Sequence, residues 1–170
     1  FEKVRRMRKA AKEQTEVLRA RTGKAVNEAT GADARDILGF VKQLTALREL
    51  RGQILAARDV RYVVAEDLAA MEKSVVEGTD RLSRQCIAFL LQPEALDPYR
   101  KQVGEQKDRI GQVKKVAEAH EVEQALLQSG TELEMLISVV SGLKIADATE
   151  TTRIIESISE LYAQLNQVRS

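Results

Sequence analysis

The sequence predicts an all-α protein, an elongated array of about five long helices packed as antiparallel hairpins or as a coiled coil, with no sheet. Aromatic residues make up 4% of the chain and tryptophan is absent, a composition that disfavours sheets. Apolar residues recur at helical spacing along most of the chain, as expected of helices that bury one face. With two prolines in 170 residues, helices can continue over long stretches.

Residues 1–34 are expected to form a basic, coiled-coil-like helix that is a separate N-terminal domain. Gly31 can end this helix in the left-handed conformation, and Asp33 is expected to cap the helix that follows. The apolar seam of the first helix has the a and d spacing of a coiled coil and comprises Val4, Met7, Ala11, Leu18 and Ala25.

A helical-hairpin domain is expected over the rest of the chain, residues 35–170. Residues 59–65 are rich in valine, but one short strand without a partner cannot form a sheet. We therefore expect an irregular connector there. The helices of this domain are predicted at about residues 34–58, 66–91, 98–140 and 148–169.

The 98–140 helix has a marked start and an irregular middle. Asp97 is expected to be its N-cap, followed by Pro98 at the first helical position, where the missing N–H costs nothing. The phase of the apolar pattern changes near His120 and Gly130, which predicts a kink or break.

The last helix begins with a capping box. Asp147 is expected to cap it, and Glu150, three residues later, can reach back to the first free backbone N–H.

No catalytic or cofactor motif occurs in the sequence. There is no phosphate-binding loop of the G-x-x-x-x-G-K-[ST] type and no G-x-G-x-x-G or H-E-x-x-H pattern. A metal site needs three or four convergent ligands, whereas the chain has one histidine, His120, and one cysteine, Cys86. We expect His120 to be solvated and Cys86 to be a small buried apolar residue. We therefore expect these 170 residues to have no catalytic activity and to bind no cofactor.

The single cysteine and the absence of a long uncharged stretch fit a cytoplasmic chain without a membrane contact. The first residue is Phe1, and we expect the chain to be a piece of a longer protein. The remainder of that protein, or a second copy of the chain, is its expected partner.

The net charge of +1 conceals two regions of opposite sign. Residues 1–12 contain six Lys or Arg residues against one Glu, and residues 116–137 contain five Glu residues and no Lys or Arg. A basic stripe on a helix can follow phosphates, although no aromatic residue interleaves this run for stacking on bases. The stripe can equally be a solvated face, or it can pair with the acidic region of a neighbouring helix or a second copy. The candidate nucleic-acid contacts are Arg5, Arg8, Lys9 and Lys12.

Three runs resemble a family of proteins. They are LISVVSGLKIADATETTRII with ISELYAQLNQ in residues 136–167, LRGQI and RYV in residues 50–63, and FLLQPEALDPY in residues 89–99. These runs are similar to the helical region of the large bacterial family called DNA repair ATPases, in which long helical segments are joined to an AAA-type ATPase module. The resemblance covers most of residues 35–170.

The resemblance implies a non-catalytic helical segment of a larger bacterial ATPase, which couples an ATP-driven motor to DNA or to a protein partner. ATP and Mg²⁺ would then bind outside these 170 residues. The alternative is a stand-alone helical module for protein interaction or oligomerisation, unrelated to an ATPase.

Overall fold

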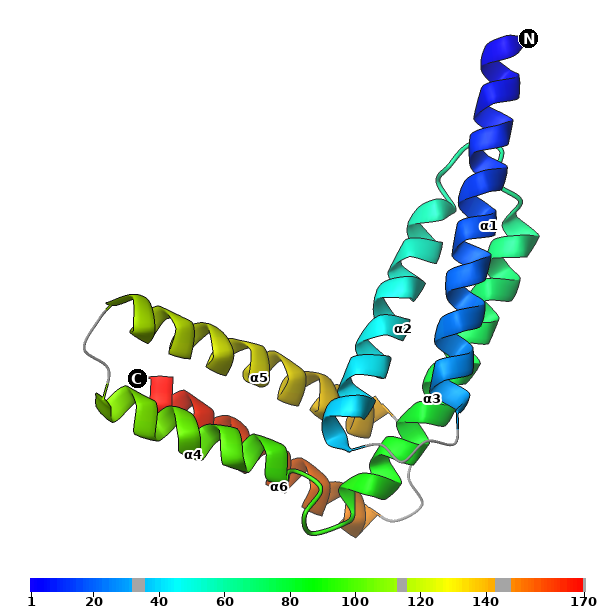
Figure 1. The fold of residues 1–170 in the computed structure, drawn as a ribbon. Coiled ribbons are helices and arrows are strands. Elements are labelled where there is room, and N and C mark those ends of the chain that lie inside the picture. Colours follow the sequence, from blue (N-terminus) through cyan, green and yellow to red (C-terminus); the bar gives the residue numbers. More distant parts are fainter. Residues whose placement is uncertain (32–35, 113–115, 143–147, 170) are drawn as a thin grey trace. The chain divides into compact units, whose positions relative to one another are not determined.

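The computed structural model describes residues 1–31, 36–112, 116–142 and 148–169. These residues form helices and short connections without a strand, which confirms the all-α prediction (Figure 1). None of the described helices has the length and apolarity needed to cross a membrane. The helices are α1 (Glu2–Thr30), α2 (Ile37–Ala57), α3 (Ala65–Leu90), α4 (Asp97–Gln112), α5 (Val116–Gly142) and α6 (Ala148–Arg169).

The described chain has six helices, not about five, because the predicted 98–140 helix is two helices, α4 and α5. The predicted kink or break is a break between two helices, and it lies before His120, because α4 ends at Gln112 and α5 begins at Val116. His120 and Gly130, where the change was placed, both lie inside α5. The ring of Tyr162 lies next to Gly130, 3.6 Å from the position that an added Cβ atom would take.

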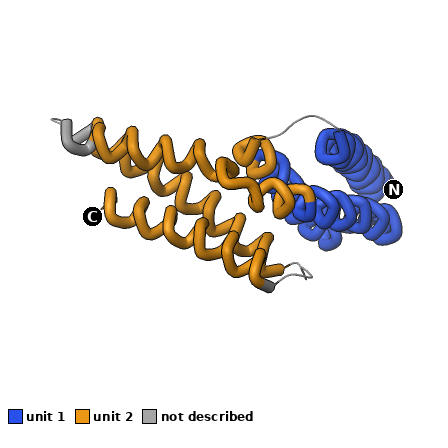
Figure 2. The backbone as a smooth tube through the Cα atoms, turned by 90° about the horizontal axis from the view of Figure 1, so that it is seen from below, with its two compact units in different colours: residues 1–35, 42–84 blue, residues 36–41, 85–170 orange. Residues whose placement is uncertain are grey.

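The chain forms two compact units (Figure 2). Unit 1 comprises residues 1–35 and 42–84, and unit 2 comprises residues 36–41 and 85–170. This grouping does not coincide with the predicted domain boundary at residue 34, because α1 packs against residues of α2 and α3 within unit 1.

Side chains join the three helices of unit 1. Arg21 of α1 donates a hydrogen bond to Gln53 of α2 at 3.1 Å. Gly78 of α3 lies against Val26 of α1, with 3.6 Å between the side chain and the position of an added Cβ. Glu72 of α3 pairs with Arg51 of α2 at 3.6 Å and with Arg58, which directly follows α2.

In unit 2, α4, α5 and α6 pack against one another. Figure 1 shows α5 running back alongside α4, and α6 running back alongside α5. Two polar contacts lie in this packing. Tyr99 of α4 donates to Glu132 of α5 at 2.7 Å, and Ser129 of α5 donates to Gln102 of α4 at 2.6 Å. The buried apolar residues of these helices include Val122, Leu126, Leu133, Leu136, Ile158 and Leu165.

Two of the predicted capping residues, Asp97 and Glu150, lie in the described part of the chain. Asp97 is the first residue of α4 and not the residue before it. Its Oδ1 accepts from the Arg100 guanidinium at 3.0 Å, because the preceding turn already offers the Leu96 carbonyl to the first amides of the helix. Glu150 lies in the first turn of α6. Asp33 and Asp147 lie outside the described residues.

Asp36 caps α2, which the sequence analysis did not foresee. Its Oδ1 accepts a hydrogen bond from the amide of Gly39 at 2.9 Å. This is the bond of an N-cap residue to the third helical position.

Candidate nucleic-acid interface

The first turns of α1 carry the predicted basic residues. Figure 1 shows the N-terminal end of α1 projecting beyond the connection between α2 and α3. Arg5, Arg8, Lys9 and Lys12 are all exposed. Positions four and three apart lie on the same side of a helix, so Arg5, Lys9 and Lys12 form one continuous positive stripe. We call Arg5, Arg8, Lys9 and Lys12 together the basic surface.

Within the described part of the chain, no ion pair joins Arg5, Lys9 or Lys12 to a carboxylate. Their neighbour Arg6 lies 3.7 Å from Glu2, and both side chains are about 80% exposed. Such exposed pairs contribute little free energy. The positive charge of the stripe is therefore available to an external anion.

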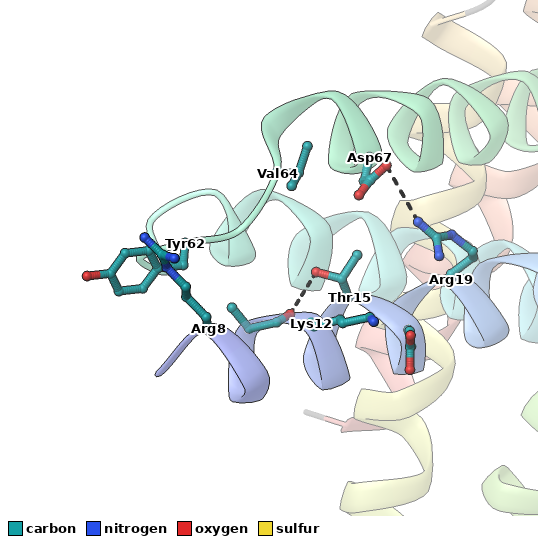
Figure 3. A pocket seen from close by; sticks show the side chains of 9 residues that line it. Arg8, Lys12, Thr15, Arg19, Tyr62, Val64 and Asp67 are labelled. Atoms are coloured by element: carbon teal, nitrogen blue, oxygen red, sulfur yellow. Dashed lines mark hydrogen bonds and ion pairs between the residues drawn. The ribbon is translucent and has the colours of Figure 1, made fainter. Parts of the chain in front are cut away.

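Arg8 differs from the other three cations because it contacts an aromatic ring. Its guanidinium carbon lies 5.2 Å from the ring centroid of Tyr62, in the connection between α2 and α3 (Figure 3). The guanidinium of Arg61 lies at the same distance from that centroid. The sequence analysis found no aromatic residue within the basic run, yet packing brings one beside it. No local pattern could show this, because Arg8 and Tyr62 are distant in the sequence.

A pocket of about 320 Å³ opens beside this ring, between α1 and the start of α3 (Figure 3). Arg19 of α1 and Asp67 of α3 form an ion pair on its wall at 3.5 Å. The Thr15 hydroxyl donates to the carbonyl of Ala11 at 2.8 Å, so its proton is already used within α1. The remaining lining is Arg8, Lys12, Glu16, Tyr62 and Val64.

The acidic region of residues 116–137 has partners inside unit 2. Glu121 lies 3.6 Å from Arg109. Glu132 accepts from Tyr99, and Glu134 accepts from the Tyr162 hydroxyl at 2.6 Å. These three carboxylates are thus already engaged with side chains of their own unit.

Cys86 is buried and His120 is exposed, as expected from the sequence. Cys86 is fully buried, and burial raises the pKa of its thiol to about 12. It is therefore a neutral, shielded group at physiological pH. His120 is exposed on α5. No cluster of three or more His, Cys, Asp or Glu residues suited to a metal ion occurs among the described residues.

Comparison with known proteins gives one match. Residues 94–170 match the model of a family described as a domain of unknown function (DUF7902). No curated protein and no solved structure matches the chain significantly. The match includes α4, α5 and α6, and the basic surface on α1 lies outside it.

Proposed function

We propose that this chain is a non-catalytic helical segment of a larger bacterial ATPase of the DNA repair ATPase type, and that it contacts DNA through the basic surface. The observation that carries the proposal is the exposed stripe of Arg5, Lys9 and Lys12 in the first turns of α1. Cations without intramolecular partners are suited to phosphates, since each contact releases a condensed counterion from the nucleic acid.

The contact is with the phosphate backbone and does not read bases. The stripe offers lysine and arginine side chains, and phosphate contacts alone carry no sequence information. Binding is therefore sequence-independent and weakens steeply as salt is added.

The segment acts as a rigid arm in this proposal. A helix of 29 residues such as α1 is about 43 Å long at 1.5 Å per residue. We propose that the helices form an elongated array of antiparallel hairpins, as in a coiled coil, that transmits movement between a motor outside these residues and DNA. Small-angle scattering tests this part, because a profile of a compact sphere contradicts it.

A second function, protein interaction or oligomerisation, is favoured by an apolar groove in unit 1. The groove lies between α1 and α2 and has a volume of about 470 Å³. Val17, which lines it, is 49% exposed. Exposed apolar side chains beside a groove are a feature of surfaces that bind a helix.

Two measurements on the double variant R5E/K9E separate these functions. Fluorescence anisotropy with a labelled duplex measures DNA binding, and sedimentation velocity measures assembly. The matched control is K24E/K42E, which makes the same change of charge at two exposed lysines. Lys24 lies on the same helix about 28 Å from Arg5 at 1.5 Å per residue.

The DNA function predicts that R5E/K9E weakens binding to every duplex sequence alike while K24E/K42E binds nearly as the wild type does. If neither the wild type nor the control binds DNA, and the wild type sediments as an oligomer, the interaction module is the function. The link to an ATPase is tested separately: a Walker A motif in the full-length gene product supports it, and a full-length product without one contradicts it.

A further inference from the structure

We propose that the pocket at Tyr62 seats single-stranded nucleic acid, with one base stacked on the Tyr62 ring and the adjoining phosphates bound by Arg8, Arg61 and Lys12. This inference rests on the proposed function and adds to it a preference for single strands over duplex. The arrangement on which it depends is an aromatic ring between cations at the edge of a pocket.

The backbone at Tyr62 is the first observation. Tyr62 has a φ of 71° and is the one residue other than glycine with a positive φ in the described chain. A bulky side chain rarely takes this conformation because Cβ meets the neighbouring carbonyl. Such outliers concentrate at binding and active sites, where the surrounding structure holds them in place. Here the connection between α2 and α3 holds the ring against Arg8 of α1.

The charges around the ring are the second observation. Two guanidinium groups, of Arg8 and Arg61, lie 5.2 Å from one ring centroid, so two like charges are held close together. Lys12 adds a third cation at the pocket wall. Of the two carboxylates in the lining, Asp67 is paired with Arg19. This leaves Glu16 against the lining cations Arg8 and Lys12, and Arg61 adds a further charge at the ring. The local excess is positive, and a phosphodiester neutralises it.

Guanidinium groups serve both halves of this contact. They stack on aromatic faces and form paired hydrogen bonds with phosphate oxygens. An incoming strand can therefore draw a guanidinium from the ring to a phosphate while a base takes its place on the ring. Tyr62 is half-buried, so part of its ring is open to a ligand.

The size of the pocket and the state of the bases give the preference for single strands. A volume of about 320 Å³ lies in the range of small-ligand sites. Bases in a duplex are already stacked on their neighbours and cannot reach the ring. Unpaired bases can stack on an aromatic side chain whatever the sequence of the strand. A duplex therefore gains only the phosphate contacts.

The test uses the 170-residue chain with three labelled probes: a dT 12-mer, an rU 12-mer and a 12-base-pair duplex. Two variants share one position: Y62F keeps the ring, and Y62G removes it while suiting the left-handed backbone. We expect the wild type and Y62F to bind a single strand about 10-fold more tightly than duplex, within the range that stacking of one base provides. Y62G should bind the single strand and the duplex about equally.

Intrinsic fluorescence gives a readout that does not depend on the stability of Y62G. Stacking of a base should quench the tyrosine emission of the wild type, and the quenching should be absent in Y62F, which has no Tyr62 fluorophore. Binding of the dT probe, the rU probe or both with this quenching supports the inference.

Equal affinity of the wild type for single strand and duplex overturns the inference, as does a single-strand affinity of Y62G equal to that of the wild type. In both cases a loss of duplex binding in R5E/K9E leaves the proposed function standing. If no probe binds to the wild type, the inference and the proposed DNA function fail together.

Discussion

Replacing Tyr99 with Phe removes one hydroxyl from the interior of unit 2 and leaves the ring in place. The Tyr99 side chain is 1% exposed, and its hydroxyl donates to Glu132 Oε2 at 2.7 Å. Glu132 keeps a second hydrogen bond, from Gln128 to its other oxygen at 3.1 Å. A hydrogen bond to a charged group contributes about 1.5–3 kcal/mol. Because half-buried Glu132 can recover part of this from water, we expect Y99F to lose about 1–2 kcal/mol of the free energy of unfolding.

The matched control is Y162F. Tyr162 makes the same kind of bond, to Glu134 at 2.6 Å, but in an exposed position. Water replaces such a bond readily, so we expect urea denaturation at pH 7 to show no measurable change in its midpoint for Y162F. A loss in Y162F as large as that in Y99F, or no loss in Y99F, would refute the view that the buried Tyr99–Glu132 bond stabilises unit 2.

The same pair of variants has a pH signature. Burial, reinforced by the hydrogen bond to Glu132 and its charge, raises the pKa of Tyr99 above its usual value. A pKa that is higher in the folded than in the unfolded chain gives stability that is complete below the unfolded pKa of about 10 and is lost as the pH rises above it. The difference between wild type and Y99F should therefore narrow above pH 10. A difference that stays constant to pH 11 would contradict this reasoning.

The remaining predictions concern Cys86, Asp36 and Gly52. Burial raises the pKa of the Cys86 thiol to about 12, so the thiol should resist a thiol reagent at pH 8. Because this pKa is higher in the folded than in the unfolded chain, C86V should lose less free energy of unfolding than the wild type between about pH 9 and 12. Parallel curves of unfolding free energy against pH would contradict this. D36A should lower the free energy of unfolding, measured by urea denaturation, by about 0.5–2 kcal/mol, because the cap on the Gly39 amide is lost. D36N keeps an acceptor oxygen and should lose much less. Equal losses in the two variants would argue against capping. G52A should stabilise by about 0.5–1 kcal/mol, because no atom lies within 4 Å of the added Cβ in α2, and a lower midpoint would be the opposite result.

Local sequence patterns place most helix boundaries well. The 66–91 and 148–169 helices expected from apolar spacing and breakers correspond to α3 (Ala65–Leu90) and α6 (Ala148–Arg169). These signals are local, since a proline or a change of period acts within a few residues.

Errors arise where one local signal fits two structures. A change of apolar phase fits a kink as well as a chain reversal, so α4 and α5 were expected as one helix. Asp33 and Asp36 are close together in the sequence, and spacing alone could not identify Asp36 as the residue that caps α2.

One part of the candidate site could be predicted from the sequence and another part could not. The exposure of Arg5, Arg8, Lys9 and Lys12 follows from their positions on one amphipathic helix. The contact of Arg8 with Tyr62 depends on the packing of α1 beside the α2–α3 connection, and the period of either segment contains no information about it.

The salt dependence of duplex binding tests the central claim most directly. The claim is that Arg5 and Lys9 contact phosphates, and each neutralised phosphate contributes about −0.9 to the slope of log affinity against log salt concentration. Anisotropy titrations of wild type, R5E/K9E and K24E/K42E at several salt concentrations measure these slopes. We expect R5E/K9E to have a slope shallower by about two units and K24E/K42E to keep the slope of the wild type. Equal slopes for wild type and R5E/K9E would contradict the account.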